Sequence, residues 1–245
     1  MTKKRDRSDH SHAVLDQQSR YRKANKILSV LSAYTDLEDK ELLDLGTGSG
    51  YMASRFAEKC KSVTSVDVVD ERRVKSGYNY CKVRDEALPF KDESFDIVIS
   101  NHVIEHVQDQ TRHIGEIKRV LKDGGYIYLA TPNKYWISDP HYRLPFLPIM
   151  SKVIGTQYIK LLKRGKEWDV QPVSPILLNK FIHPFDARYV VPQLLKYPEK
   201  FELDMMQKVT SISKYFPDQL LKSSHYMSPT LIYIARKNIS FEVGS

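Results

Sequence analysis

The chain has 245 residues, of which 41% are hydrophobic and 28% are charged, so its composition is that of a globular protein with a sizeable core rather than of a disordered chain. No apolar run approaches the ~18 residues of a membrane-spanning helix, and the first ten residues lack the apolar segment of a secretory signal, so we expect a cytoplasmic protein. The formal net charge is +8, and the only two cysteines, Cys60 and Cys81, have no metal-ligand spacing.

The N-terminal part of the chain predicts a tail, a helix and the start of a sheet. Residues 1–10 predict a disordered tail. A helix is predicted over 12–34, where apolar residues recur at helical spacing: Leu15, Tyr21, Ala24, Ile27, Leu28 and Leu31. Strands are predicted at 41–45 and 62–66, with a glycine-rich turn and a helix at about 50–59 between them. This order is typical of a nucleotide-binding βαβ unit.

The turn carries the most specific motif, Asp44-Leu-Gly46-Thr47-Gly48-Ser-Gly50. Gly46 and Gly48 have no Cβ, so the backbone can turn tightly and a ligand can lie against it. Asp67 ends the second strand, where its carboxylate can accept hydrogen bonds from both ribose hydroxyls. The spacing does not complete the dinucleotide pattern G-x-G-x-x-G, and Asp44 would repel a phosphate. It therefore favours a ligand with a positive group.

This segment resembles motif I of the class I S-adenosylmethionine (SAM) methyltransferases, whose cofactor carries an ammonium and a sulfonium and no phosphate. Two further segments are similar to the small-molecule, type 11-like branch of that family: Ala87-Leu-Pro-Phe90 through Phe95-Asp96 to Glu105-His106-Val107, and Leu121-Lys-Asp-Gly-Gly125 through Thr131-Pro132-Asn133. The match covers roughly residues 20–133. The resemblance implies SAM as cofactor, with S-adenosylhomocysteine as product.

The resemblance also assigns the cofactor-binding residues, which are Asp44, Gly46, Thr47, Gly48, Asp67, Val68, Asp85, Glu86 and Asn101. One position departs from the family pattern. The family places an acidic residue four positions before the Leu of the Leu-Pro-Phe segment, where it binds the adenine amino group, and that position is Arg84 here. Either Asp85 takes this role after a shift of one residue, or backbone and apolar contacts hold the adenine.

The remaining elements complete a Rossmann-like fold. Strands are predicted near 79–83, 95–100 and 125–130, and a helix near 109–122 that ends at Gly124-Gly125. Residues 201–206 and 231–236 predict the last two strands. Alternating strands and helices predict an α/β fold with a doubly wound, seven-stranded sheet, and the resemblance implies an antiparallel last strand. Residues 11–133 and 201–245 would form the core, and 134–200 an inserted helical cap that binds the acceptor.

The predicted cap is basic. Residues 134–245 contain 16 Lys and Arg against 9 Asp and Glu, whereas residues 1–133 contain 22 against 21. This favours an anionic acceptor or surface, although a solvated basic face is the usual cause of such an imbalance. Asp139-Pro-His141-Tyr142 is similar to a segment of methyltransferases from glycan and cell-envelope pathways. Five residues are candidates to line an acceptor pocket or to form the cap's own core: Tyr135, Trp136, Tyr142, Trp168 and Ser174.

Methyl transfer to a hydroxyl benefits from a general base, for which histidine is suited. The candidates are His106, His102 and His141, with His183 as a further one. His106 belongs to the Glu105-His106 pair, for which a structural role remains open. His102 to His106 is also similar to the metal-binding E-x-x-E-H segment of ubiquinone-type O-methyltransferases. We expect no metal, because Glu105 and His106 would point in different directions on a helix.

Residues 143–166 carry six basic residues and no acidic one. Apolar residues recur there at helical spacing: Ile149, Met150, Val153, Ile154, Tyr158, Leu161 and Leu162. Lys152, Thr156, Lys160 and Lys163 would share the opposite face. Such a helix either covers the active site as a lid or lies on an anionic membrane surface. Gly155 would weaken it, as in a hinge or a segment that orders on binding.

We therefore predict a SAM-dependent methyltransferase that methylates an oxygen of a small molecule, a sugar or a lipid-linked glycan. The alternatives are an RNA or protein methyltransferase that uses the basic cap, and a non-catalytic SAM-binding partner subunit. A nucleic-acid acceptor is not favoured, because no nucleic-acid motif occurs and Asn101-His102-Val-Ile stands where N-P-P-Y or D-P-P-Y would follow the fourth strand.

Overall fold

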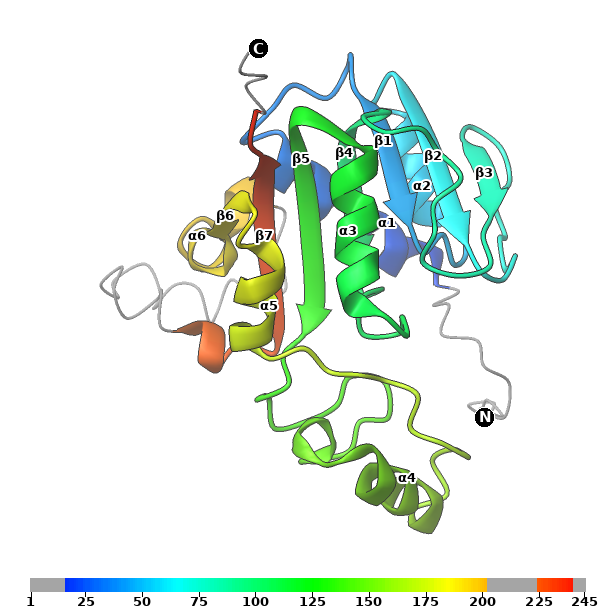
Figure 1. Ribbon diagram of the computed structural model, residues 1–245, viewed down its shortest axis with the longest axis vertical. Helices are drawn as coiled ribbons and strands as arrows, with labels where there is room; N and C mark the ends of the chain where they lie inside the picture. Colours follow the sequence, from blue (N-terminus) through cyan, green and yellow to red (C-terminus); the bar gives the residue numbers. More distant parts are fainter. Residues whose placement is uncertain (1–15, 202–223, 240–245) are drawn as a thin grey trace, which may run out of the picture.

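The computed structural model describes residues 16–201 and 224–239, which form one sheet with helices on both faces (Figure 1). The strands are β1 (Glu41–Leu45), β2 (Ser62–Asp67), β3 (Asn79–Lys82), β4 (Phe95–Asn101), β5 (Leu121–Pro132), β6 (Phe185–Tyr189) and β7 (Thr230–Lys237). Their order is β3-β2-β1-β4-β5-β7-β6, and β7 runs antiparallel to both of its neighbours. The predicted α/β, doubly wound, seven-stranded sheet with an antiparallel last strand is confirmed.

The side chains of each central strand alternate between two cores. Leu42, Ile97 and Ile99 face one core, and Leu43 and Val98 face the other. Helices α1 (Gln17–Leu31), α2 (Tyr51–Ala57) and α6 (Val191–Lys196) cover the first face, and α3 (Gln110–Val120) and α5 (Pro175–Ile182) cover the second. Strands buried on both faces explain the continuous apolar runs of the sequence.

Most predicted elements lie where the sequence places them, and the differences have local causes. Helix α1 begins at Gln17, because the Asp16 side chain accepts from the Ser19 N–H and caps it. Predicted helical residues 12–15 and the tail 1–10 lie outside the described residues. Helix α3 ends at Val120 and β5 starts at once, so Gly124 and Gly125 lie within β5 and do not end the helix.

The strand next to β7 at the edge of the sheet lies in a segment where the sequence analysis predicted no strand. The neighbour of β7 is β6, at Phe185–Tyr189, which the sequence analysis assigned to the cap. The segment predicted as this strand begins at Phe201, which ends the 3-10 helix η2 (Pro198–Phe201), and its residues 202–206 lie outside the described ranges. Phe185 is the only fully buried residue of β6. A short edge strand with charged outward residues has a weak apolar signal. The division into core and cap stays a prediction.

An insertion, residues 134–172, extends from the sheet at the end where the parallel strands finish (Figure 1). It leaves and returns at one place, where Asn133 forms a bridge with Val173 and the Lys134 N–H donates to the Val173 carbonyl at 3.1 Å. It contains the 3-10 helix η1 (Leu147–Ile149) and helix α4 (Lys152–Leu161). Its own small core consists of Leu144, Leu147, Ile159, Trp168 and Val170.

Among the described residues, no helix combines the length and the apolar character needed to cross a bilayer.

Candidate active site

A cavity of about 720 Å³ lies at the carboxyl ends of β1, β2 and β4. It is lined by all nine residues predicted to bind the cofactor, which are Asp44, Gly46, Thr47, Gly48, Asp67, Val68, Asp85, Glu86 and Asn101. It is also lined by the three histidines predicted as bases, His102, His106 and His141. The structure therefore brings the two predicted groups of residues to one site.

The glycine-rich turn forms one wall of the cavity. The N–H groups of Gly46 and Thr47 donate to the Val66 carbonyl at 2.9 and 3.1 Å, which ties the turn to the end of β2. The Gly48 N–H donates to Oδ2 of Asp67 at 2.8 Å. This bond holds the Asp67 carboxylate beside the turn, at the place where a ribose would lie in a βαβ site.

The glycines of the turn are required by the backbone conformation and, at two positions, by close packing. Gly46, Gly48 and Gly50 all have positive φ, at 77°, 52° and 79°. Residues other than glycine adopt such a backbone conformation only at a cost in free energy. A Cβ on Gly46 would lie 2.7 Å from Cγ2 of Val103, and a Cβ on Gly50 would overlap the Tyr78 hydroxyl. Gly46 and Gly50 are therefore required by the packing of the protein itself, independently of any ligand.

Asp44 is a buried acid at the end of β1. Its Oδ2 accepts from the Ser65 hydroxyl at 2.9 Å, and Ser65 lies 2.6 Å from the Thr47 hydroxyl. Burial raises the pKa of Asp44 to about 7, and the nearby charge of Asp67 adds to this rise. A cationic ligand group would favour the ionised carboxylate. The carbonyl oxygen of the Asn101 side chain is also buried and accepts no hydrogen bond within the described residues, so a ligand N–H would satisfy it.

The cavity wall beyond β3 holds Asp85, one candidate to bind the adenine amino group, and Glu86, predicted to bind the cofactor. Oε1 of Glu86 accepts from the backbone N–H groups of Gln108 and Asp109 at 2.8 and 3.2 Å, so Glu86 already holds the loop before α3. Asp85 is exposed, and its Oδ1 accepts from the Ala87 N–H and lies 3.6 Å from Arg112. Val68 and Val69 are 51% and 55% exposed and give this wall an apolar surface that suits a flat ring.

Glu105 fixes the loop that follows β4. It is fully buried, its Oε2 accepts from the Thr131 hydroxyl at 3.1 Å, and its Oε1 lies 3.2 Å from Nδ1 of His102. Burial raises the pKa of Glu105, but the hydrogen bond from His102 and the charges of the neighbouring imidazoles outweigh burial and lower it. Burial and the charge of Lys23 lower the pKa of His102. Glu105 therefore acts as an ionised anchor, and His102 is bound to it.

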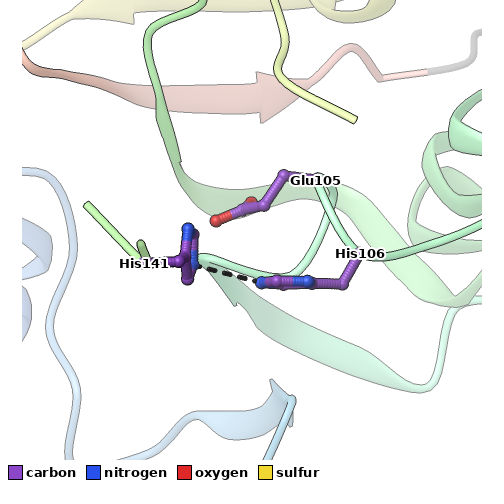
Figure 2. Close-up of side chains that lie close together, drawn as sticks. All are labelled: Glu105, His106 and His141. Atoms are coloured by element: carbon purple, nitrogen blue, oxygen red, sulfur yellow. Dashed lines mark hydrogen bonds between the residues drawn. The ribbon is translucent and has the colours of Figure 1, made fainter. Parts of the chain in front are cut away.

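His106 and His141 both line the cavity, and their side chains lie against each other, as Figure 2 shows. Their Nε2 atoms are 3.3 Å apart and their rings are nearly perpendicular, at 88°. Asp139 orients His141, because its Oδ1 accepts from the N–H groups of His141 and Tyr142 at 2.8 and 2.7 Å, while its Oδ2 lies 3.8 Å from Nδ1 of His141. The Asp-Pro-His-Tyr segment is thus a turn that brings one histidine of the insertion against one histidine of the core.

Glu105, His106 and His141 also form a group that could hold a divalent cation, with ligand atoms all within 4.8 Å of one another. The sequence analysis excluded a metal by placing Glu105 and His106 on a helix. That reason was wrong, because residues 104–106 form a turn, which directs both side chains toward His141. The expectation that the site works without a metal stays a prediction.

Several charged or titratable residues of the cavity were not predicted as site residues, among them Arg20, Lys23 and His113. Burial and the charges of Arg20 and Lys26 lower the pKa of Lys23 to about 7, although Glu105 opposes this. Burial lowers the pKa of His113 to about 4, and its Nε2 lies 3.1 Å from the Ser100 hydroxyl. The spacing of Arg20 and Lys23 places them on one face of α1, but nothing in the sequence links that helix to the cavity.

The remaining candidates for the base and for the acceptor pocket lie outside the cavity lining. His183 is exposed and follows the end of α5, outside the cavity lining. Ser174 caps α5 by accepting from the Leu177 N–H, and Trp168 lies in the small core of the insertion. Tyr142, which packs on that core, donates its hydroxyl to Asp169 at 2.9 Å. None of the five residues proposed to line an acceptor pocket lines this cavity.

Comparison with known proteins identifies the fold and the domain. Residues 43–129 match the family described as a methyltransferase domain. A probable S-adenosylmethionine-dependent methyltransferase of Mycolicibacterium smegmatis is 27% identical over 61% of this chain and 60% of its own length. A ubiquinone biosynthesis O-methyltransferase of Pseudomonas fluorescens is 28% identical over 63% of this chain and 69% of its own length. The aligned region thus spans less than two thirds of the mycobacterial protein.

A solved structure of an S-adenosylmethionine-dependent methyltransferase from Mesorhizobium loti is similar in fold, with a TM-score of 0.56 and 16% identity over 87% of this chain and 98% of that one. These comparisons confirm the resemblance to class I SAM-dependent methyltransferases. At the level of the matched domain they agree with the predicted enzyme class and cofactor, which stay proposals for the whole chain.

Proposed function

We propose that this chain, which carries a methyltransferase domain at residues 43–129 and has the class I methyltransferase fold, catalyses SAM-dependent methyl transfer to an oxygen atom of its acceptor. The observation that carries the proposal is the shared cavity, in which the glycine-rich turn and Asp67 lie in the same hollow as a pair of histidines. A site that only stored a nucleotide would need the turn and the acid, but not the pair.

The donor set on the sheet side of the cavity fits SAM. Asp67 would accept from the ribose hydroxyls, and the exposed faces of Val68 and Val69 would contact the adenine. The buried carboxylate of Asp44 and the side-chain carbonyl of Asn101 suit the ammonium of the methionyl group. Arg20, whose Nε is buried without a hydrogen bond among the described residues, would meet a carboxylate of the cofactor or of an anionic acceptor.

When bound, SAM supplies a methyl group on a sulfonium that is already a leaving group, so the chain must exclude water, align the acceptor and take up one proton. His106 or His141 can take up this proton. A neutral Nε2 receives it from the hydroxyl of the methyl acceptor while the oxygen–carbon bond forms and the carbon–sulfur bond breaks. Asp139 holds His141 in place for this, and Glu105 holds the loop that carries His106.

An anionic or hydroxylated small acceptor fits the surroundings of the histidine pair. Arg20 and Lys23 bring positive charge to the cavity, and one of the relatives is named for O-methylation in ubiquinone biosynthesis. We therefore favour a phenol, a sugar hydroxyl or a lipid-linked glycan as the acceptor class. The glycine-rich turn lies in the part of the chain whose charge is nearly balanced, which gives no support for docking of RNA at the turn itself.

Two measurements test the proposal. Isothermal titration with SAM and with S-adenosylhomocysteine should show binding of both. Transfer of tritium from labelled SAM to lysate fractions should label small molecules or lipids. Label in RNA or protein would favour a methyltransferase for those acceptors, and binding without any transfer would favour a non-catalytic partner subunit. The absence of SAM binding would contradict the proposal as a whole.

A further inference from the structure

Helix α4 is attached to the rest of the insertion along one narrow face. Only Gly155 and Ile159 of the helix are buried, and both lie against Trp168 and its neighbours. A Cβ on Gly155 would lie 2.9 Å from Cζ3 of Trp168, so the helix and the indole approach as closely as glycine permits. The backbone N–H of Trp168 donates to the Thr156 hydroxyl at 3.2 Å. The close packing against Trp168 thus explains why a glycine stands at position 155.

Most of the apolar residues predicted for one face of this helix are exposed to solvent, whereas Met150 and Tyr158 pack against the core of the insertion. The exposed fractions are 73% for Val153, 59% for Ile154 and 78% for Leu161. Neighbouring residues at both ends of the helix extend this surface, with Phe146 and Ile149 at 56% and 55% and Leu162 at 44%. Contiguous large apolar side chains on an exposed surface mark interaction sites more often than scattered ones do. In the structure these exposed residues do not pack α4 onto the core as a lid.

Positive charge surrounds this apolar surface. Lys152, Lys160, Lys163, Arg164 and Lys166 are all exposed, and no acidic residue occurs between Arg143 and Lys166. Lys152 pairs with Glu167 at 3.1 Å. A convex helix with exposed aliphatic side chains between flexible cations matches the interface of an anionic bilayer, where the apolar groups enter the acyl boundary and the cations meet phosphate headgroups.

The surface also lies at the correct end of the molecule for such a role. Figure 1 shows α4 beyond the ends of the parallel strands, away from the helices that cover the sheet. The cavity opens at that same end, and His141 reaches it from the same insertion. A bilayer in contact with α4 would therefore lie near the histidine side of the cavity, and not near the sheet edges.

We propose that the docking surface, which we define as residues 146–166 with α4 at its centre, binds the headgroup and interface region of an anionic phospholipid bilayer. The proposal goes beyond methyl transfer and does not depend on it, because it concerns a surface whose residues do not line the cavity. Its consequence for the enzyme is that the acceptor would be reached from the bilayer interface.

The test uses the full chain and vesicles of two compositions, phosphatidylcholine alone and phosphatidylcholine with about one quarter phosphatidylglycerol. We expect co-sedimentation with the anionic vesicles at about 50 mM salt, at least about tenfold weaker partition at about 500 mM salt, and little partition onto neutral vesicles. Equal partition onto both compositions, or none onto either, would overturn the proposal, as would retention by RNA or protein without partition onto vesicles.

Variants separate the two parts of the surface. The double variant Lys160→Glu/Lys163→Glu should weaken partition at least about tenfold, and Val153→Asp/Leu161→Asp should weaken it to a similar degree. All four residues are exposed, so the variants should keep the parent's thermal midpoint and its affinity for SAM. Lys59→Glu/Lys118→Glu is the matched control, because it reverses two exposed lysines on the helical layers of the core. If the control weakened partition as much as the α4 variants, the assignment to α4 would be wrong.

Discussion

The cavity has two walls of different origin, and they differ in what holds each residue in place. The sheet wall comes from the ends of β1, β2 and β4, where hydrogen bonds between neighbouring strands and turns set the position of Asp44, Gly48 and Asp67. The insertion wall depends on a single turn at Asp139 that carries His141 to His106, 35 residues away in sequence. The sheet wall is therefore fixed by the pairing of neighbouring strands, whereas the insertion wall exists only when the turn at Asp139 packs against the loop after β4.

The two parts of the chain that carry these walls also differ in charge and in exposed surface. The sheet wall belongs to a half of the chain with nearly balanced charge, and the insertion belongs to the half with the excess of basic residues. The exposed apolar side chains of α4 have no counterpart in α2 or α3, whose apolar residues enter the two cores. This contrast suggests that one wall serves a cofactor common to the fold and the other an acceptor specific to this chain. The predictions below test that separation.

The largest expected effect is on turnover when the histidine pair is broken. His106→Gln and His141→Gln should each lower the rate by ~10²–10⁴ and leave SAM affinity within about twofold of the parent, because a general base contributes to the chemical step and not to cofactor binding. Single-turnover transfer and calorimetry measure the two quantities. His183→Gln is the control, since His183 lies outside the cavity lining. Near-parent rates in both variants would show that the acceptor needs no base.

The second effect concerns the sheet wall. Asp67→Ala removes two charge-assisted hydrogen bonds to the ribose, each worth about 1.5–3 kcal/mol, so SAM affinity should fall at least tenfold. It also removes the acceptor of the Gly48 N–H, which donates to Oδ2 of Asp67 at 2.8 Å. Calorimetric titration gives the affinity. Asp70→Ala serves as the matched control, because Asp70 lies three residues further along and does not line the cavity. Unchanged affinity in Asp67→Ala would overturn the role of β2.

The third effect is a dependence of cofactor affinity on pH that belongs to the sheet wall. The pKa of Asp44 is raised to about 7 by burial, so its ionised fraction grows as the pH rises through that value. A cationic ligand prefers the ionised form, and SAM affinity should therefore rise about fivefold to tenfold between about pH 6 and about pH 7.5. In Asp44→Asn the rise should disappear. A parent affinity that falls over this range would contradict the assignment of Asp44 to the cationic group.

The smallest expected effect is that of removing metal ions. We expect turnover to stay within about twofold after treatment with a chelator, since methyl transfer from a sulfonium needs no Lewis acid when a base is present. Glu105, His106 and His141 nevertheless offer a set of ligands. A rate that falls with chelation, returns with a divalent cation, and does not respond to that cation in His141→Ala would mean that the insertion wall works through a metal.

Much of the sheet wall could be predicted from sequence because its determinants are contiguous. A strand, a turn with glycines at positive φ and a following helix are local features, and the parallel order of β1, β2 and β4 then brings Asp44, Asp67 and Asn101 to one edge of the sheet. The sequence did not predict β6, because a short edge strand with one buried residue has little periodic signal.

The sequence by itself thus determined six of the seven strands, the glycine-rich turn and many residues of the sheet wall, since backbone geometry and hydrophobic periodicity encode them within short segments. Only the tertiary structure decided which histidines meet, that Arg20 and Lys23 of α1 reach the cavity, and that α4 leaves its apolar residues in solvent. The physical reason is that these outcomes depend on packing between distant segments. The turn at Asp139 and the contact of Gly155 with Trp168 choose one arrangement among several that the local pattern allows.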